Sequence, residues 1–115
     1  MRRKIFLGVD LVEYKKAKIF YTEHRNRLKN YFDKSELSFI QKSLKPYEAL
    51  ALLLAAKEAV FKSGDLAWMG PQGFCKIRII SRKNQRLSFH PSLSFLKSKD
   101  YVIAECRASR LSQGL

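Results

Sequence analysis

Three charged side chains in apolar surroundings are the residues of this sequence best suited to chemistry. Asp10 interrupts an apolar segment that begins at Leu7, and Glu58 and Lys62 lie four residues apart in Ala55-Ala-Lys-Glu-Ala-Val-Phe-Lys62. A carboxylate within an apolar strand must be paired, hydrated or bound to a metal ion, because an isolated charge is costly to bury. Residues four apart share one face of a helix, so Glu58 and Lys62 form the charged face of a helix that is otherwise apolar.

Both features also have a simpler interpretation. Asp10 would then be a strand-end carboxylate that meets solvent or a lysine, and Glu58 and Lys62 would be an exposed stripe on a buried helix. Glu–Lys pairs at this spacing contribute only about a few tenths of a kcal/mol to helix stability. Composition alone favours this simpler interpretation for the helix.

The N-terminal third of the chain predicts the elements that would position Asp10. Residues 4–12 place apolar side chains at every second position, which is the periodicity of a strand. Beyond Glu13, apolar residues recur every three or four positions while basic residues fill the gaps, which predicts a basic amphipathic helix with room for one break. The basic residues of this segment are Lys15, Lys16, Lys18, Arg25, Arg27 and Lys29.

Two further helices are predicted before the middle of the chain ends. Asp33 begins a capping box in which its side chain accepts a hydrogen bond from the amide of Glu36, and a short helix follows. Pro46 suits the first turn of the next helix, and residues 47–62 contain no internal Gly or Pro. Because the middle of this helix is apolar nearly all round, we expect it to be the central buried helix.

The remaining residues predict strands. Gly64, Gly70, Pro71 and Gly73 mark a loop, followed by predicted strands over 75–80, 86–89 and 100–108 and a frayed tail over 109–115. The order of strand, helices and strands is typical of an α+β domain in which a mainly antiparallel sheet packs against helices. We expect residues 1–115 to form one such domain.

The composition is that of a globular and strongly basic protein. Of its 115 residues 46% are hydrophobic and 29% are charged, which excludes disorder of the whole chain. The longest apolar stretch, residues 49–56, is far shorter than the ~18 residues that a membrane helix needs. Lys and Arg outnumber Asp and Glu by 23 to 10, and the resulting charge of +13 attracts nucleic acid, anionic membranes, phosphorylated molecules or acidic proteins.

The cysteines and the N-terminus point to an ordinary cytoplasmic protein. Cys75 and Cys106 belong to no Cys-x-x-Cys pair or Cys/His cluster, so we expect buried thiols rather than a zinc site. The basic N-terminus and the apolar residues after it resemble a signal peptide, but Asp10 interrupts them and no small-residue cleavage site follows. We therefore expect a cytoplasmic location and no membrane partner.

The order of two motifs is more informative than either motif alone. The segment Gly8-Val-Asp-Leu-Val-Glu13, followed later by Ala55-Ala-Lys-Glu-Ala-Val-Phe-Lys62, resembles the holo-[acyl-carrier-protein] synthases, which are small 4′-phosphopantetheinyl transferases. The resemblance extends over most of the chain and includes Ser35-Glu-Leu37, His90-Pro-Ser-Leu-Ser94 and Asp100-Tyr-Val-Ile-Ala104. It implies transfer of the phosphopantetheine arm of coenzyme A to a serine of an acyl carrier protein, with release of 3′,5′-ADP, for fatty acid or polyketide synthesis.

The resemblance also implies roles for single residues. Asp10 and Glu58 would hold Mg²⁺, which usually meets a pyrophosphate under attack with one or two protein carboxylates. Glu58 would also orient or deprotonate the serine, and Lys62 would neutralise the pyrophosphate or the leaving group. The candidate coenzyme contacts are Lys57, Lys62, His90 and Ser92. The alternatives are an exposed or carboxylate-paired lysine for Lys57 and a structural hydrogen bond for His90.

The basic helix fits an acidic partner. By resemblance, the acyl carrier protein would meet basic residues that follow the first strand, and Lys16, Arg25 and Arg27 are the candidates here. Such complementarity mainly raises the association rate and its salt sensitivity. A solvated helix face is the alternative. The resemblance further implies a homotrimer with active sites between protomers.

The chain departs from the family pattern at three places. Leu53 stands where an arginine is expected to bind a coenzyme phosphate, and Phe95 stands where a second histidine is expected. The glycine-threonine-glycine stretch that usually follows the helix is absent.

These departures leave the function open between three hypotheses. In the favoured one, other basic groups such as Arg82, Lys83 and Arg86 replace the missing arginine and the protein is a transferase. In the second, the chain is a weak or inactive homologue that binds acidic carrier proteins without using coenzyme A well. The third is a basic nucleic-acid-binding domain, which the absence of an RNA-recognition or helix-turn-helix motif makes least favoured.

Overall fold

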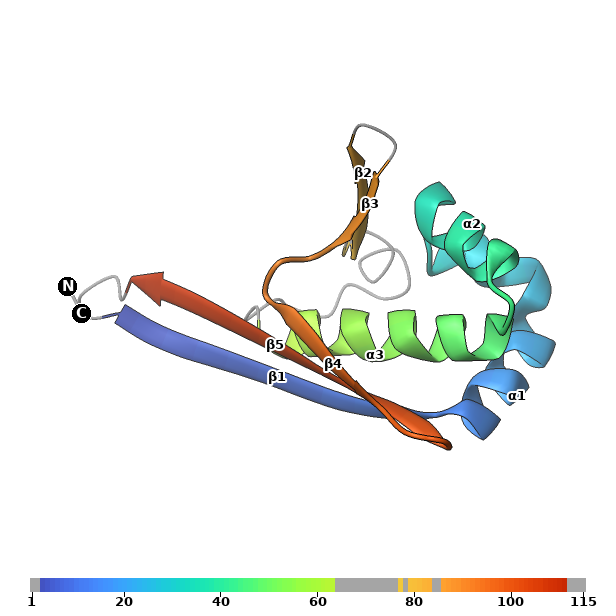
Figure 1. Cartoon of the computed structure of the whole chain (residues 1–115), viewed down its shortest axis with the longest axis horizontal. Coiled ribbons are helices and arrows are strands. Elements are labelled where there is room, and N and C mark those ends of the chain that lie inside the picture. Colours follow the sequence, from blue (N-terminus) through green and yellow to red (C-terminus); the bar gives the residue numbers. More distant parts are fainter. Residues whose placement is uncertain (1–2, 64–76, 78, 84–85, 112–115) are drawn as a thin grey trace.

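The computed structural model of the protein describes residues 3–63, 77, 79–83 and 86–111. The elements follow in the order β1 (Arg3–Glu13), α1 (Tyr14–His24), the 3-10 helix η1 (Arg25–Asn30), α2 (Lys34–Lys42), α3 (Pro46–Ser63), β2 (Ile80–Lys83), β3 (Arg86–Phe89), β4 (Leu93–Lys97) and β5 (Tyr101–Leu111). Figure 1 shows the helices α1 and α2 at one end of the molecule and the paired ends of β1 and β5 at the other.

The strands form an antiparallel sheet and a separate hairpin. The sheet has the order β1-β5-β4, and β2 pairs only with β3. In the sheet Gly8 lies opposite Cys106 and Asp10 opposite Ala104, while Leu96 of β4 pairs with Ile103 of β5. The predicted α+β architecture with a mainly antiparallel sheet is therefore confirmed.

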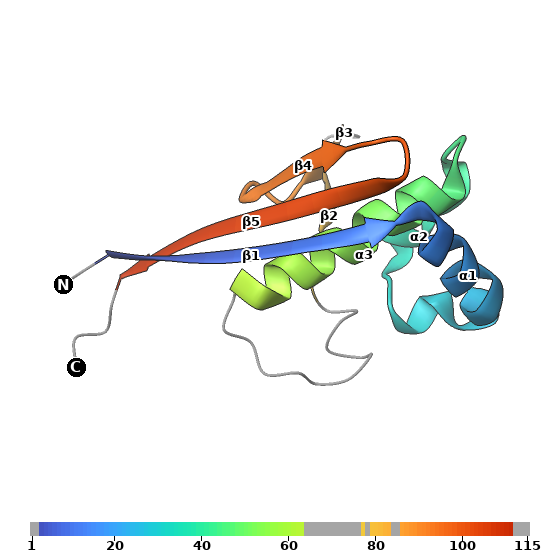
Figure 2. The same ribbon diagram turned by 90° about the horizontal axis from the view of Figure 1, so that it is seen from below.

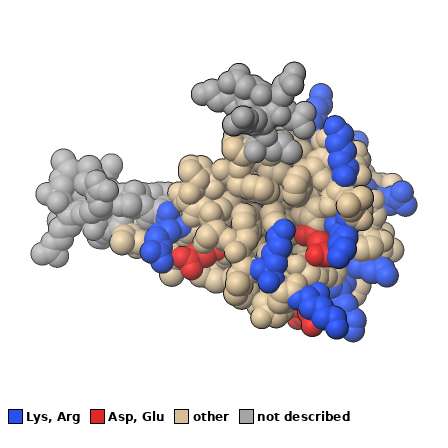
Figure 3. All heavy atoms as spheres, viewed as in Figure 1, with Lys and Arg blue, Asp and Glu red and all other residues tan. Residues whose placement is uncertain are grey.

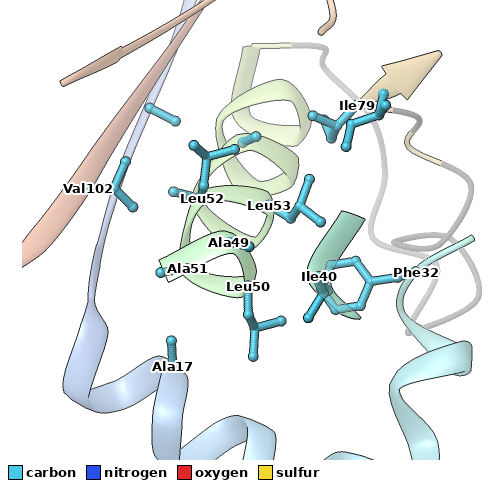
Figure 4. Close-up of a cluster of buried hydrophobic side chains, with 14 of the residues drawn as sticks. Ala17, Phe32, Ile40, Ala49, Leu50, Ala51, Leu52, Leu53, Ile79 and Val102 are labelled. Atoms are coloured by element: carbon cyan, nitrogen blue, oxygen red, sulfur yellow. The ribbon is translucent and has the colours of Figure 1, made fainter. Parts of the chain in front are cut away.

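Helix α3 is the centre of the core. It runs along β1 and β5 on one face of the sheet, as Figures 1 and 2 show from two directions. Ten of its residues are buried, from Ala49 to Ser63, which confirms the prediction of a central buried helix. In Figure 4 Leu52 points toward Val102 of β5, and Leu53 points toward Ile79 and Ile40. The helix is thus packed between the sheet and α2, so its position is determined from both sides.

The N-terminal helical segment has the predicted break. Helix α1 ends at His24 and the chain tightens into η1, whose last residue is Asn30. Ala17 and Leu28 are buried on the apolar face. The capping box of α2 is also present, because the Asp33 side chain accepts from the Glu36 amide at 2.9 Å.

Three sequence predictions are corrected by the strands. Strand β2 spans Ile80–Lys83, and of the predicted strand over 75–80 the described residues 77 and 79 lie in no strand, although Ile79 is buried. Strand β4 (Leu93–Lys97) was not predicted, because the exposed Leu96 interrupts the alternation of apolar and polar residues that its burial follows over the first four positions. Strand β5 continues to Leu111, so residues 109–111 of the predicted frayed tail pair with β1. Residues 112–115, Cys75 and the loop glycines after α3 lie outside the described residues.

Cys106 is a buried free thiol in β5, as expected from the sequence. Among the described residues, no helix combines the length and the hydropathy needed to cross a bilayer.

Candidate active site

Gly8 brings the first strand into direct backbone contact with the central helix. A Cβ atom at position 8 would overlap the carbonyl oxygen of Ala59 and would lie 2.7 Å from the amide nitrogen of Ser63. Only a residue without a side chain permits this approach of two backbones. Because side chains alternate along a strand, Asp10 lies on the same helix-facing side as Gly8. The close approach therefore presents Asp10 to the last turns of α3.

Asp10 meets Lys62 at this junction. The Lys62 Nζ donates to Asp10 Oδ1 at 3.1 Å and lies 3.4 Å from the carbonyl oxygen of Val9. The side chain of Asp10 is 22% exposed and that of Lys62 is 48% exposed, so solvent and ligands can reach the pair. The lysine-paired alternative for Asp10 is thus realised, but the pair is open rather than sealed in the core.

Glu58 lies one helical turn before Lys62 and interacts with both members of the pair. Partial burial raises the pKa of the Glu58 carboxyl above its usual value, the charge of Asp10 raises it further, and Lys62 lowers it. The carboxylates of Asp10 and Glu58 are thus close enough to repel one another, and the positive charge of Lys62 acts against this repulsion. A carboxylate with a raised pKa is a better proton acceptor than an ordinary glutamate.

The donor set at this junction fits a hard divalent cation. Among the described residues, no group of three or more His, Cys, Asp or Glu side chains could hold a metal ion. Magnesium commonly binds only one or two protein carboxylates and completes its shell with waters and substrate phosphates. Two interacting carboxylates with accessible oxygens, Asp10 and Glu58, meet that requirement. Burial is the main cause of the raised pKa of Glu58, and a bound cation would relieve the repulsion by Asp10 that adds to it.

Lys57 does not belong to this exposed group, and its prediction as a coenzyme contact is corrected. Its side chain is completely buried, and its Nζ forms an ion pair with Glu36 Oε1 at 2.8 Å. The neighbouring residues Lys57 and Glu58 therefore point into different environments: the lysine into the core and the glutamate toward solvent. This is the carboxylate-paired alternative for Lys57.

His90 and Ser92 lie on the turn between β3 and β4. The amide of Ser92 donates to His90 Nδ1 at 3.2 Å, which leaves the proton of a neutral imidazole on Nε2 as a donor. Both side chains are partly exposed. Within the described part of the chain, no hydrogen bond or ion pair connects them directly with Asp10, Glu58 or Lys62.

The basic candidates lie on the helical end of the molecule. Lys16, Arg25 and Arg27 are exposed on α1 and η1, and much of the Lys and Arg surface visible in Figure 3 is at this end. Arg25 stacks over the Tyr21 ring at 5.8 Å and borders a hollow of about 410 Å³ between η1 and α2. Lys16 approaches Glu13 only to 4.0 Å, an exposed pair that contributes little to stability.

The departures from the family pattern have structural consequences. Leu53 is completely buried, so an exposed cationic contact at this position is lost, and Phe95 packs edge-on against Phe89 at 5.5 Å. The proposed replacements Arg82, Lys83 and Arg86 lie in the β2–β3 hairpin, but their side chains are outside the described part of the structure.

Two residues important for this geometry were not identified from the sequence. Glu36 was considered only as a backbone donor, although the side chain of the N3 residue of a capping box also accepts from the N-cap amide, here that of Asp33. Gly8 was part of the motif but had no assigned role, although an isolated glycine inside a strand is a signal of close backbone approach.

Comparisons with known proteins agree with the fold and identify the family. The family model of the 4′-phosphopantetheinyl transferase superfamily, ACPS, matches residues 6–106. A search of curated proteins finds no match. The structure is similar to that of a holo-[acyl-carrier-protein] synthase from Neisseria meningitidis, with 22% identity, a TM-score of 0.70 and coverage of 89% of this chain and 95% of that chain.

Structures solved with coenzyme A are also similar. The complex from Chronobacterium ammoniagenes has 21% identity, a TM-score of 0.71 and coverage of 96% and 99% of the two chains. The complex from Helicobacter pylori has 16% identity, a TM-score of 0.62 and coverage of 86% and 96%. With a family model that spans most of its length and the fold of the holo-[acyl-carrier-protein] synthases, this chain belongs to the 4′-phosphopantetheinyl transferase superfamily.

Proposed function

We propose that the protein transfers the 4′-phosphopantetheine arm of coenzyme A to a serine of an acyl carrier protein in a Mg²⁺-dependent reaction that releases 3′,5′-ADP. The observation that carries the proposal is the junction of β1 and α3, where the accessible Asp10–Lys62 pair interacts with a glutamate of raised pKa. Superfamily membership supplies the reaction class. Such a reaction serves fatty acid or polyketide synthesis, and we place it in the cytoplasm.

Glu58 is the proposed proton acceptor. Transfer requires the serine hydroxyl to lose its proton as its oxygen attacks the phosphorus of the phosphopantetheine arm. Glu58 can take this proton directly or through one water, because its pKa is raised and its side chain is only partly buried. The proton would then be held at the carboxylate oxygen until solvent removes it.

Lys62 is the proposed partner of the charge that develops on the leaving group. When the bond between the pyrophosphate oxygen and phosphorus breaks, negative charge grows on the departing 3′,5′-ADP. The Lys62 side chain is 48% exposed, so its ammonium can turn from Asp10 toward a phosphate oxygen without leaving the site.

Asp10 and Glu58 are the residues that would hold Mg²⁺. The ion would supply charge stabilisation to the pyrophosphate, as divalent cations do in phosphoryl transfer. Mn²⁺ prefers similar oxygen ligands, so both metals belong in the assay.

His90 and Ser92 are the remaining proposed contacts of coenzyme A. The proton on His90 Nε2 suits a phosphate oxygen, and the Ser92 hydroxyl can donate a second hydrogen bond. Lys57 is left out because it is buried. The similar structures from Chronobacterium ammoniagenes and Helicobacter pylori are described as complexes with coenzyme A, which supports this ligand.

The function is tested by mass spectrometry of an apo-acyl carrier protein incubated with this protein, coenzyme A and Mg²⁺. We expect a phosphopantetheine mass increase that EDTA abolishes and added Mg²⁺ restores. No mass increase with several carrier proteins, from a sample shown to be folded, would contradict the transferase. Carrier-protein binding without transfer would then support the second candidate, a non-catalytic binder, which the burial of Leu53 in place of the expected arginine favours.

Charge reversal on the helical end should weaken carrier-protein binding. We expect Lys16→Glu or Arg25→Glu to raise the Kd for the carrier protein roughly tenfold at low salt, because electrostatic attraction of an acidic partner is lost. Affinity for coenzyme A should stay unchanged. Calorimetric titration with each ligand measures both values.

Lys97→Glu is the matched control for this experiment. It makes the same charge change at an exposed residue that belongs to neither α1 nor η1 and lies in β4, which β5 separates from β1. An equal loss of carrier-protein affinity in this control would show that net charge matters and that the basic helix is not the docking surface.

We also propose that the protein forms a homotrimer through the outer face of its sheet. Strand β1 is an edge strand, and the apolar side chains on its outer face are 45% to 69% exposed. These residues are Ile5, Leu7, Val9 and Leu11. A contiguous exposed apolar row of this kind marks an interaction surface. The trimeric state itself is taken from the resemblance to the family.

Leu7→Asp should therefore dissociate the oligomer. Light scattering after size-exclusion chromatography should give a trimer mass for the unmodified protein and a monomer mass for the variant. Leu44→Asp, at a completely exposed leucine between α2 and α3, is the control and should remain trimeric. A monomeric unmodified protein at micromolar concentration would contradict the proposal.

A further inference from the structure

The buried ion pair between Glu36 and Lys57 is the least expected feature of the core. Both side chains are completely buried, and Lys57 Nζ lies 2.8 Å from Glu36 Oε1. A buried ion pair is often no more stabilising than apolar side chains of similar volume, because both charges lose their hydration. A gain in stability is therefore a weak explanation for the presence of this ion pair. The hydrogen bonds that Glu36 and Lys57 make to other segments are more informative.

Glu36 and Lys57 together connect four segments of the chain. Glu36 Oε1 also accepts from the Asp33 amide at 2.9 Å, and Glu36 Oε2 accepts from the Ile79 amide at 3.3 Å. The Lys57 ammonium donates to the Tyr31 carbonyl oxygen at 3.0 Å. The pair thus ties α3 to the end of η1, to the start of α2 and to the segment that enters β2.

Hydrogen bonds continue from this pair to the proposed coenzyme contacts. The Ile79 carbonyl oxygen accepts from the His90 amide at 2.8 Å, and His90 Nδ1 accepts from the Ser92 amide at 3.2 Å. The Ile79 backbone is thus bonded at both polar groups: its amide donates to Glu36, and its carbonyl oxygen accepts from the amide of His90. The position of the His90–Ser92 turn is therefore linked to Lys57, the residue that precedes Glu58.

Aromatic packing also links α2 to the turn between β3 and β4. Phe39 of α2 meets Phe89 edge-on at 5.8 Å, immediately before His90. Helix α2 thus contacts the β3–β4 turn through a ring pair as well as through Ile79. Ring packing permits sliding, whereas a carboxylate oxygen bonded to one amide determines register.

We propose that Glu36 and Lys57 are positioning residues that hold the His90–Ser92 turn in register with α3 and so allow coenzyme A to contact both. The inference rests on the function proposed above. Neither side chain touches substrate, since both are completely buried. Their effect is on where two sets of ligand-binding groups stand relative to one another, and it should therefore appear in coenzyme binding before it appears in carrier-protein binding.

Glu36→Gln is the most selective variant. Glutamine keeps the shape of the side chain but has one acceptor oxygen, so it cannot serve both the Lys57 side and the Ile79 amide. We expect the KM for coenzyme A to rise about tenfold, as for the loss of one buried hydrogen bond, while the KM for the carrier protein stays unchanged. Ile40→Val, a buried change one turn later on α2, is the matched control and should leave both KM values unaltered.

Amide hydrogen exchange tests the positioning without relying on catalysis. In Glu36→Gln, exchange at the Ile79 and His90 amides should accelerate about tenfold relative to Ile40→Val. The Tyr14 amide, which donates to the Asp100 carbonyl oxygen at 2.9 Å outside the segments that the pair connects, is the control amide and should not change.

A double variant keeps the test valid if glutamine prevents folding. Glu36→Leu with Lys57→Met removes both buried charges together, which proteins often tolerate. It should show the same rise in the KM for coenzyme A and the same faster exchange. Unchanged KM and unchanged exchange in an active, folded double variant would overturn the positioning role. Absence of transfer by the unmodified protein would instead overturn the proposed function, and the exchange data would still decide whether the pair holds the turn.

Discussion

Replacing Glu58 by glutamine is expected to slow phosphopantetheine transfer by about two to four orders of magnitude, the range found when a general base is lost. Asp10→Asn should cause a loss of similar size, because the charge that pairs with Lys62 and would bind Mg²⁺ is removed. Both variants should fold normally, since neither side chain is fully buried. Transfer rates from mass spectrometry and thermal unfolding curves measure the two effects separately.

Glu48→Gln is the control for this prediction. Glu48 lies in the first turn of the same helix, is also partly exposed, and forms a 3.4 Å ion pair with Lys45. Its substitution should leave transfer within about twofold of the unmodified rate, as for surface changes of small effect. If Asp10→Asn lowered stability but left transfer unaltered, the simpler interpretation of a structural Asp10–Lys62 pair would be correct.

Gly8→Ala is expected to reduce the free energy of unfolding by about 3 kcal/mol, the upper part of the usual range for overpacking. The added methyl group would overlap the backbone carbonyl of Ala59, which cannot rotate away as a side chain would. Strand β1 or helix α3 must therefore move. Because Ala59 follows Glu58 directly, we also expect transfer to fall more than the loss of folded protein explains. Urea unfolding gives the stability change.

The sign of the change in the free energy of unfolding of Gly8→Ala is informative by itself. Alanine in place of glycine within a strand would otherwise stabilise the protein by about 0.5–1 kcal/mol, since glycine loses more backbone entropy on folding. Ile19→Ala, at an exposed position of α1, is the control and should cost less than about 1 kcal/mol. A Gly8→Ala variant as stable as the unmodified protein would show that β1 and α3 are not held in backbone contact.

Local signals in the sequence were sufficient for most of the helices. The capping box at Asp33 depends on residues three apart, and the burial of α3 follows from a continuous apolar composition that no exposed helix would carry. The sequence left room for one break in the basic helix, and the structure places it after His24. Strand β4 was not foreseen, because its exposed Leu96 interrupts the alternation of apolar and polar residues by which a strand is recognised.

The sequence by itself determined which residue types were available for chemistry: Asp10 in a strand, and Glu58 and Lys62 on one helix face. The tertiary structure decided which of them meet. A distance of 3.1 Å between Lys62 and Asp10 depends on the approach of β1 to α3 at Gly8, a contact between segments far apart in the chain. No local propensity encodes such a distance.

Only the tertiary structure separated Lys57 from Glu58. From the sequence Glu58 was a candidate for the metal and the serine, and Lys57 a candidate for a phosphate of coenzyme A. Helical geometry turns the two neighbours in different directions without saying which direction is solvent. The buried carboxylate of Glu36 at the start of α2 determines that Lys57 is the residue that faces the core, because a charged lysine is tolerated there only beside a carboxylate. Composition and spacing thus determined the chemistry that was possible, while long-range packing determined which side chains were left to perform it.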